Sequence, residues 1–446
     1  MRRLRRWPRI HQRALGIIAL LLCGCGKLSA QQPDFSNLVF VGDSLTAGFR
    51  SGSLTADSQQ SGYAAWLARR INTILFQPLV DPRFLPEFRL SESQFPFTVQ
   101  RPAGDLTLFP RLAPFIYATN LAVPGYTLGD ALTYVPDTST SQRNLFPLIV
   151  FGIPTLQSPF AGRTQLGMAE LFQPSFMVVW LGNNDALGAA LTPLSGRLTP
   201  PEVFRRQYTE LVGRLRQLGL AYGTKIIVAN VPDVTAVASL TSRDKLARYL
   251  RRDVGEVAAR LGVREGDFVT ADSFRFVADI MSGRLPGPLP RDFILTAEKV
   301  VTIRAGIAQY NAIIRELSQA YSDFRFPVMD AYAVFNDLVA NGATIGNIRL
   351  TTDFLGGIFG LDGTHPTSTG YALMTNYFVD AINGFYGAAI PRLSEAELLA
   401  IMAKDPLAPS PAKRADDSPA VLSMSENDYQ ELLNRMLGGE RPERPE

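Results

Sequence analysis

Cysteine and histidine are both scarce in this chain of 446 residues. There are two of each: Cys23 and Cys25, and His11 and His365. Both cysteines lie close to the N-terminus in a segment with the features of a signal peptide. Its removal would leave at most one cysteine, which excludes an internal disulfide. The same scarcity excludes a zinc site built from a Cys/His cluster, and we expect no metal and no other cofactor.

The chain also has little net charge. Lys and Arg number 44 and Asp and Glu 41, a formal net charge of +3. The first 13 residues contain six Arg and no acidic residue, so removal of residues 1–24 would change the charge from +3 to −3. The apparent basicity therefore belongs to the signal, and we expect no nucleic-acid partner.

The N-terminal segment is typical of an export signal. A basic stretch precedes the apolar run 14–22, which at about nine residues is too short to span a bilayer. Leu22-Cys23-Gly24-Cys25 follows and resembles the bacterial lipobox. Cys25 fits the lipid acceptor better than Cys23, because the residue before it is small.

This pattern predicts a signal peptide over residues 1–24, lipidation of Cys25 and a tether over residues 25–35. The protein would then be an exported bacterial lipoprotein, held on the outer membrane through Cys25, since Gly26 is no inner-membrane retention acid. The alternatives are an ordinary secretory peptide and a short membrane anchor. Which face of the membrane carries the domain stays open.

Residues 36–403 have the pattern of one α/β domain. Apolar runs predict buried strands at 38–41, 120–125, 176–181, 225–230 and 327–330. Helical spacing predicts helices at 62–75, 163–171, 201–218, 240–263, 300–320 and 369–382. Strands that alternate with helices predict a mostly parallel sheet with helices on both faces.

Three long stretches interrupt this alternation, near residues 77–118, 132–160 and 240–290, and we interpret them as loop and helical insertions. Residues 404–446 turn to Pro, Ser and charge, which predicts a mobile tail with a peripheral helix at 427–437 and no catalytic role.

The first strand ends in Gly42-Asp43-Ser44, which makes Ser44 a candidate nucleophile. The carboxyl ends of the strands are where an open α/β sheet binds its ligands. The alternative is an ordinary strand-to-helix turn in which Ser44 is the helix N-cap.

A serine nucleophile needs a base, and the base needs an acid to orient it. Once the signal is removed, His365 is the one remaining histidine, and Asp362 lies three residues before it. That spacing lets the carboxylate reach Nδ1 within one loop and leaves Nε2 free to face Ser44. The alternative is a capping Asp and a surface imidazole.

An acyl-transfer site also needs donors for the developing oxyanion. The candidates are the N–H groups of Ser44 and Gly125 and the side-chain amide of Asn184, with Asn183 as a competing donor. We interpret Asp43 and Asp185 as residues that organise local hydrogen bonds.

The four motifs together resemble the GDSL family of the SGNH-hydrolase superfamily, and they occur in the family's order. They are Gly42-Asp43-Ser44-Leu45, Gly125 within Asn120–Gly125, Gly182-Asn183-Asn184-Asp185 and Asp362-Gly363-Thr364-His365-Pro366. The resemblance implies a flavodoxin-like three-layer α/β/α sandwich and ester hydrolysis without a metal, and it assigns the amide donor to Asn184. We expect the insertions to form the pocket walls.

From these residues we predict a serine ester hydrolase that acts on a small-molecule or lipid ester. Two alternatives remain: an acyltransferase with the same site, and a non-catalytic surface lipoprotein that binds lipid or glycan. Lipase, thioesterase and carbohydrate deacetylase are not separated by the sequence, nor is the oligomeric state.

Overall fold

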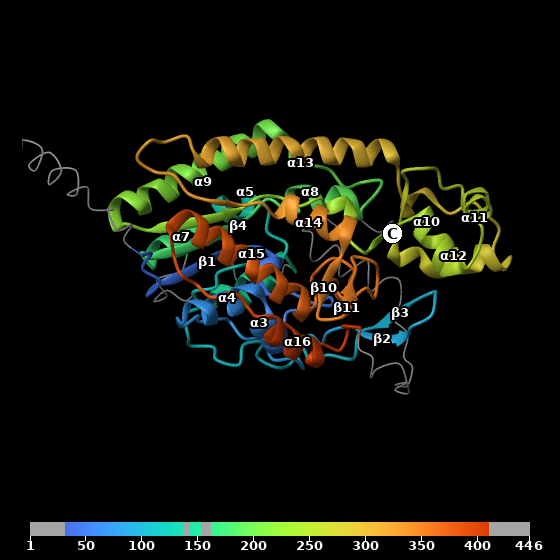
Figure 1. Ribbon diagram of the computed structural model, residues 1–446, viewed down its shortest axis with the longest axis horizontal. Coiled ribbons are helices and arrows are strands. Elements are labelled where there is room, and N and C mark those ends of the chain that lie inside the picture. Colours follow the sequence, from blue (N-terminus) through green and yellow to red (C-terminus); the bar gives the residue numbers. More distant parts are fainter. Residues whose placement is uncertain (1–31, 138–141, 153–161, 410–446) are drawn as a thin grey trace, which may run out of the picture.

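A computed structural model of the chain describes residues 32–137, 142–152 and 162–409 (Figure 1). The predicted signal peptide, Cys25, the first residues of the predicted tether and the predicted helix at 427–437 lie outside the described residues. Among the helices within the described ranges, none is long and apolar enough to cross a membrane.

The centre of the fold is a parallel sheet of four strands in the order β1-β4-β5-β9. Its strands are β1 (Leu38–Gly42), β4 (Phe176–Trp180), β5 (Lys225–Ala229) and β9 (Val328–Met329). On the free side of β1, Phe40 pairs in parallel with Asn120, and Val123 N–H donates to the Gly42 carbonyl at 3.0 Å. The strand predicted at 120–125 is therefore a short parallel pairing, and with it the strand order is that of flavodoxin-like sheets.

Both faces of the sheet are covered, because successive side chains of a strand point to opposite faces. Leu38 and Phe40 pack into one apolar cluster, whereas Val39 and Val41 pack into another. The first cluster includes side chains of α4 (Tyr63–Ile71) and α15 (Ser368–Tyr386). The second includes side chains of α5 (Leu128–Thr133), α6 (Leu145–Phe151), α7 (Gln165–Leu171), α8 (Asn184–Leu191), α9 (Pro201–Tyr222) and α13 (Ala297–Ser318). The result is the predicted three-layer α/β/α arrangement, with α9 and α13 along one side in Figure 1.

The stretch 240–290 forms a small α/β unit with its own apolar cluster. It contains β6 (Leu240–Ser242), α10 (Arg243–Leu250), α11 (Val254–Leu261), β7 (Phe268–Thr270) and α12 (Phe274–Ser282), and β8 (Ile294–Leu295) completes an antiparallel sheet β6-β7-β8. The prediction of one helix over 240–263 is wrong. Ser242 caps α10 and Asp253 caps α11, so capping side chains divide the stretch into a strand and two helices.

The other elements are short pieces around this core. They are α2 (Ser44–Ala47), α3 (Ala56–Ser61), the hairpin β2 (Arg89–Glu92) and β3 (Thr98–Gln100), α14 (Ala331–Asn341), the hairpin β10 (Ala343–Ile345) and β11 (Ile348–Leu350), and α16 (Glu395–Lys404). Asp405 is buried and its carboxylate accepts from Thr369 N–H at 2.8 Å, so the folded domain continues past residue 403.

Candidate active site

Ser44 is the first residue of α2, directly after β1. Asp43 is the N-cap, and its carboxylate accepts from Leu45 N–H at 3.0 Å. The interpretation of Ser44 as the cap is therefore wrong. With Asp43 in that role, the Ser44 hydroxyl is available for other contacts.

The loop between β11 and α15 brings His365 to Ser44. Ser44 Oγ and His365 Nε2 are 2.8 Å apart, and His365 Nδ1 lies 3.0 Å from Asp362 Oδ2. All three side chains are buried, with 5%, 2% and 6% of Ser44, His365 and Asp362 exposed. The ring of Phe49 packs against the imidazole at a centroid distance of 4.7 Å. The three residues predicted from the sequence therefore form one hydrogen-bonded line.

Asp362 is surrounded by hydrogen-bond donors. Oδ1 accepts from the N–H groups of Thr364 and His365 at 2.9 and 2.8 Å, and Oδ2 accepts from Gly52 N–H at 2.7 Å. Burial by itself would raise the pKa of this carboxyl group, but the nearby His365 and these hydrogen bonds outweigh it and hold the pKa below the ordinary value. Asp362 is therefore ionised at neutral pH. The donor Gly52 was not foreseen, and no sequence motif marks it.

The three predicted oxyanion donors lie around the end of β1. Gly125 has a φ of +83°, a conformation that favours glycine. Among the described residues, no hydrogen-bond acceptor is found for the N–H groups of Ser44 and Gly125. Asn184, the first residue of α8, donates one amide hydrogen to the Tyr126 carbonyl at 2.9 Å, which leaves its second hydrogen for a ligand.

Asn183 has a different role from its neighbour. Its amide donates to Asp43 Oδ2 at 2.8 Å, so it is committed to the residue that caps α2. Asp185 accepts from Leu128 N–H and from the Thr199 hydroxyl, both at 2.8 Å. Burial raises the pKa of Asp43 and of Asp185 to about 6, although these hydrogen bonds act in the opposite direction and lower it. Both carboxyl groups hold neighbouring segments in place, in agreement with their predicted role.

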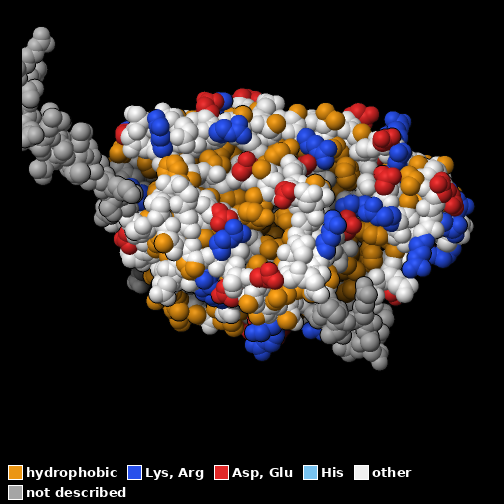
Figure 2. Space-filling view, in the orientation of Figure 1, with side chains coloured by type: hydrophobic (Ala, Val, Ile, Leu, Met, Phe, Trp, Pro, Cys, Tyr) orange, Lys and Arg blue, Asp and Glu red, His pale blue; other side chains and the backbone are white. Residues whose placement is uncertain are grey.

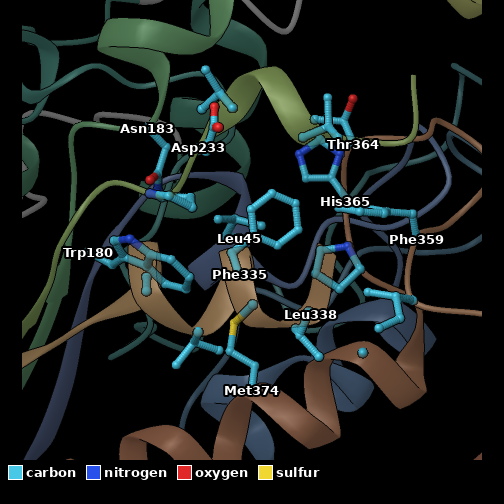
Figure 3. Close-up of a pocket in the computed structure, with 18 of the residues that line it drawn as sticks. Leu45, Trp180, Asn183, Asp233, Phe335, Leu338, Phe359, Thr364, His365 and Met374 are labelled. Atoms are coloured by element: carbon cyan, nitrogen blue, oxygen red, sulfur yellow. The ribbon is translucent and has the colours of Figure 1, made fainter. Parts of the chain in front are cut away.

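An apolar cavity opens beside Ser44 and His365 (Figure 3). Its apolar walls come from residues after β1 and β4, from the β5–β6 connection, from α14, from the loop before α15 and from α15 itself. Figure 2 shows hydrophobic side chains gathered in the middle of the visible face, over the region where Figure 1 places α14 and α15. The expectation that the insertions form the pocket walls is wrong: no described residue of 77–118, 132–160 or 240–290 lines this cavity.

Sequence reasoning missed α14, although it supplies a wall of the cavity. Its lining residues are Ala331, Val334, Phe335 and Leu338. Their spacing of three and four residues is that of one helix face, and this signal could have identified the helix. Within the described ranges, no His, Cys, Asp and Glu side chains gather in threes or more in a way that could hold a metal ion.

A parallel α/β/α sheet with a Ser–His–Asp arrangement at its carboxyl edge is typical of hydrolases that use a serine. Residues 38–378 match the family model described as GDSL-like Lipase/Acylhydrolase. The match covers more than half of the chain, and the chain therefore belongs to this family of ester-hydrolysing enzymes.

Two solved structures are similar over most of their length. LAE5, an alpha/beta hydrolase enzyme from the metagenome of Lake Arreo, Spain, is 14% identical, with 78% of this chain and 95% of that chain covered and a TM-score of 0.34. A protein from Parabacteroides merdae ATCC 43184, described as a GDSL-like lipase, is 13% identical, with 79% and 99% covered and a TM-score of 0.34. TM-scores of this size carry no further conclusion for this chain. A search of curated proteins found no match.

The buried Asp43 gives the protein a testable pH dependence. Its pKa is raised from 3.8 to about 6, so between these pH values the folded protein keeps a proton on Asp43 that the unfolded chain releases. The free energy of unfolding therefore falls as the pH rises through this range. An amide at this position cannot ionise. For Asp43→Asn we therefore expect a smaller loss of unfolding free energy between roughly pH 4 and 7, by up to about 3 kcal/mol. Denaturant unfolding at several pH values measures it, with the exposed Asp57→Asn as control. Identical pH profiles for wild type and Asp43→Asn would contradict the prediction.

Proposed function

We propose that this enzyme cleaves carboxylic esters through an acyl-serine intermediate. The observation that carries the proposal is the line of contacts from Ser44 Oγ to His365 Nε2 at 2.8 Å and from His365 Nδ1 to Asp362 Oδ2 at 3.0 Å. A serine hydroxyl is a weak nucleophile, and this arrangement supplies the base that it needs.

In the acylation step, Ser44 Oγ attacks the ester carbonyl carbon while His365 Nε2 takes the hydroxyl proton. Asp362 holds the Nδ1–H tautomer and stabilises the imidazolium that forms. The N–H groups of Ser44 and Gly125 and the Asn184 amide are the donors for the negative oxygen. When the tetrahedral intermediate collapses, the C–O bond to the alcohol breaks and His365 returns its proton to the leaving oxygen.

In the deacylation step, water replaces the alcohol. His365 accepts a proton from the water while the water oxygen attacks the acyl carbon. The bond between the acyl carbon and Ser44 Oγ then breaks as His365 delivers that proton to the serine oxygen. The products are the carboxylic acid and the regenerated enzyme.

Substitutions in the line of contacts test this mechanism. We expect Ser44→Ala and His365→Ala to lower kcat for a p-nitrophenyl ester by at least about 10³-fold, and Asp362→Asn by about 10⁴-fold, because the Asn amide favours the wrong imidazole tautomer. The half-exposed Asp380→Asn, which loses only an ion pair with Arg392, serves as a control with normal turnover. Circular dichroism would verify folding. Near-normal turnover of a folded His365→Ala protein would rule the mechanism out.

We propose further that the cavity holds an apolar acyl chain. Its polar side chains are few, and Asp233 among them is paired with Arg304 at 2.9 Å. In Figure 3, Phe335 lies between Leu45 and His365, and Met374 projects from α15 into the cavity on the opposite side of Phe335 from His365. A chain that extended from an ester carbonyl at Ser44 past Phe335 would reach Met374, and burial of its methylenes favours binding by about 0.8 kcal/mol each.

A larger residue at Met374 tests the direction of the chain. We expect Met374→Trp to lower kcat/KM for a long acyl ester at least about tenfold relative to a short one, because the indole fills the far part of the cavity. The measurement is kcat/KM across p-nitrophenyl esters from acetate to palmitate. Phe385→Trp is the control, since Phe385 is on the same helix and half exposed outside this cavity. If both variants keep the wild-type ratio, the acyl chain lies elsewhere.

We also propose that the mature chain begins at a lipidated Cys25 and is exported to the outer membrane. The support is the basic segment, the short apolar run and the small residue before Cys25. In a bacterial host fed an alkyne fatty acid, we expect Cys23→Ser to be labelled like wild type and Cys25→Ser to lose the label. Labelling that survives in Cys25→Ser would exclude this position as the acceptor.

A further inference from the structure

Large apolar side chains are exposed on two loops that do not line the cavity beside Ser44. They belong to residues 74–76, after α4, and to residues 109–116. Phe115 is 94% exposed and Ile74 is 74% exposed. We call this set the edge patch, and its members are Ile74, Phe76, Phe109, Leu112, Phe115 and Ile116.

Hydrogen bonds hold the two loops side by side. The Phe76 carbonyl accepts from the N–H groups of Thr119 and Asn120 at 2.8 and 3.0 Å, and the Leu79 carbonyl accepts from Leu112 N–H at 2.8 Å. Between these two points the chain from Leu112 to Thr119 forms an arch. Arg111 donates to the Ile116 carbonyl, which ties the arch from within. The side chains of Leu112, Phe115 and Ile116 therefore project from a backbone that is tied at both ends and from within.

Most of the edge patch lies in stretches without charge. Residues 71–80 and 112–129, which hold every member except Phe109, contain no Asp, Glu, Lys or Arg, and Arg111 beside them is buried. An exposed group of Phe, Ile and Leu without a charged residue among them is unusual on a monomer and marks a surface that meets another apolar phase. Aromatic and aliphatic side chains at loop tips suit the boundary between lipid headgroups and acyl chains.

The start of the described chain shows where such a phase would lie. The Phe35 carbonyl accepts from the Thr73 hydroxyl at 2.9 Å, which places Phe35 next to Ile74. Cys25 is ten residues before Phe35, and ten extended residues reach about 35 Å at most. A bilayer that holds a lipid on Cys25 therefore lies within reach of the edge patch.

We propose that the edge patch is a membrane-docking surface whose side chains enter the headgroup region of a phospholipid bilayer. For its geometry this rests on the proposed lipidation of Cys25, and it is independent of the chemistry at Ser44. Anchor and patch together would fix the orientation of the domain on the membrane, whereas the anchor alone would leave the domain free to turn.

Fluorescent labels test the orientation on the full chain, processed in its host and reconstituted into vesicles of phosphatidylcholine and phosphatidylglycerol. One label is placed at Phe115→Cys and one at Leu194→Cys, because Leu194 is also exposed, at 67%, but lies outside the patch. We expect brominated lipids to quench the label at 115 at least about threefold more than the label at 194. The unsubstituted protein shows whether Cys25 itself takes the label, which would signal a failure of lipidation rather than of docking.

Charge in the patch gives a second readout. For Phe115→Asp/Ile116→Asp we expect normal turnover of a soluble ester and about tenfold lower turnover of an ester embedded in the vesicles, with Leu194→Asp unchanged on both. Equal quenching at 115 and 194, or equal vesicle activity of the two variants, would overturn the proposal. A change in the label at 115 that depends on protein concentration and needs no lipid would overturn it too, and would identify a second copy of the chain as the occupant.

Discussion

The parallel pairing of β1 with its neighbours is the constraint on which the site depends. Gly42 is in register with Trp180, so β1 and β4 end at the same level. The helices that follow them begin with Ser44 and Asn184, and these two side chains therefore reach the same cavity. On the other side of β1, the bond from Val123 N–H to the Gly42 carbonyl carries Gly125 to the same edge. A slip of register in either pairing would separate the nucleophile from its oxyanion donors.

The base reaches this edge from 321 residues further along the chain, and its own loop fixes its position. Gly360 N–H donates to the His365 carbonyl at 2.8 Å, and the Gly363 carbonyl accepts from Ser239 N–H at 2.8 Å. Gly363 has a φ of +66°, and a Cβ there would lie 2.7 Å from Ser239 N, so only glycine fits. The β5–β6 connection, which also lines the cavity, thus serves as the support for the imidazole.

The residues that could be predicted from sequence are those with a local signal. The strands at 38–41 and 176–181 are continuous apolar runs, and Asp362 and His365 share one loop. Each of these features can therefore be predicted from residues that are close in sequence. Leu240–Ser242 forms a strand because it pairs with residues 268–270. The sequence around residue 240 gives no sign of a partner that lies so far along the chain. The walls of the cavity were missed for a related reason. Insertion 77–118 does approach the site, but on the side of Asp362 and not at the cavity. There Phe88 N–H donates to the Ser51 carbonyl, next to Gly52, whose N–H donates to Asp362.

Burial acts on Asp43, Asp185 and Asp362, yet their pKa values move in opposite directions, because the charge of His365 and a larger number of hydrogen-bond donors act on Asp362. Asp362 accepts from three backbone N–H groups and from the imidazole, whereas Asp43 and Asp185 each accept from one backbone N–H and one neutral side chain. The pKa of Asp362 is therefore lowered, while the pKa values of Asp43 and Asp185 are raised to about 6. At slightly acidic pH the carboxylate that faces His365 keeps its charge, whereas the other two take up protons. The negative charge that stabilises an imidazolium is thus held where the proton transfer needs it.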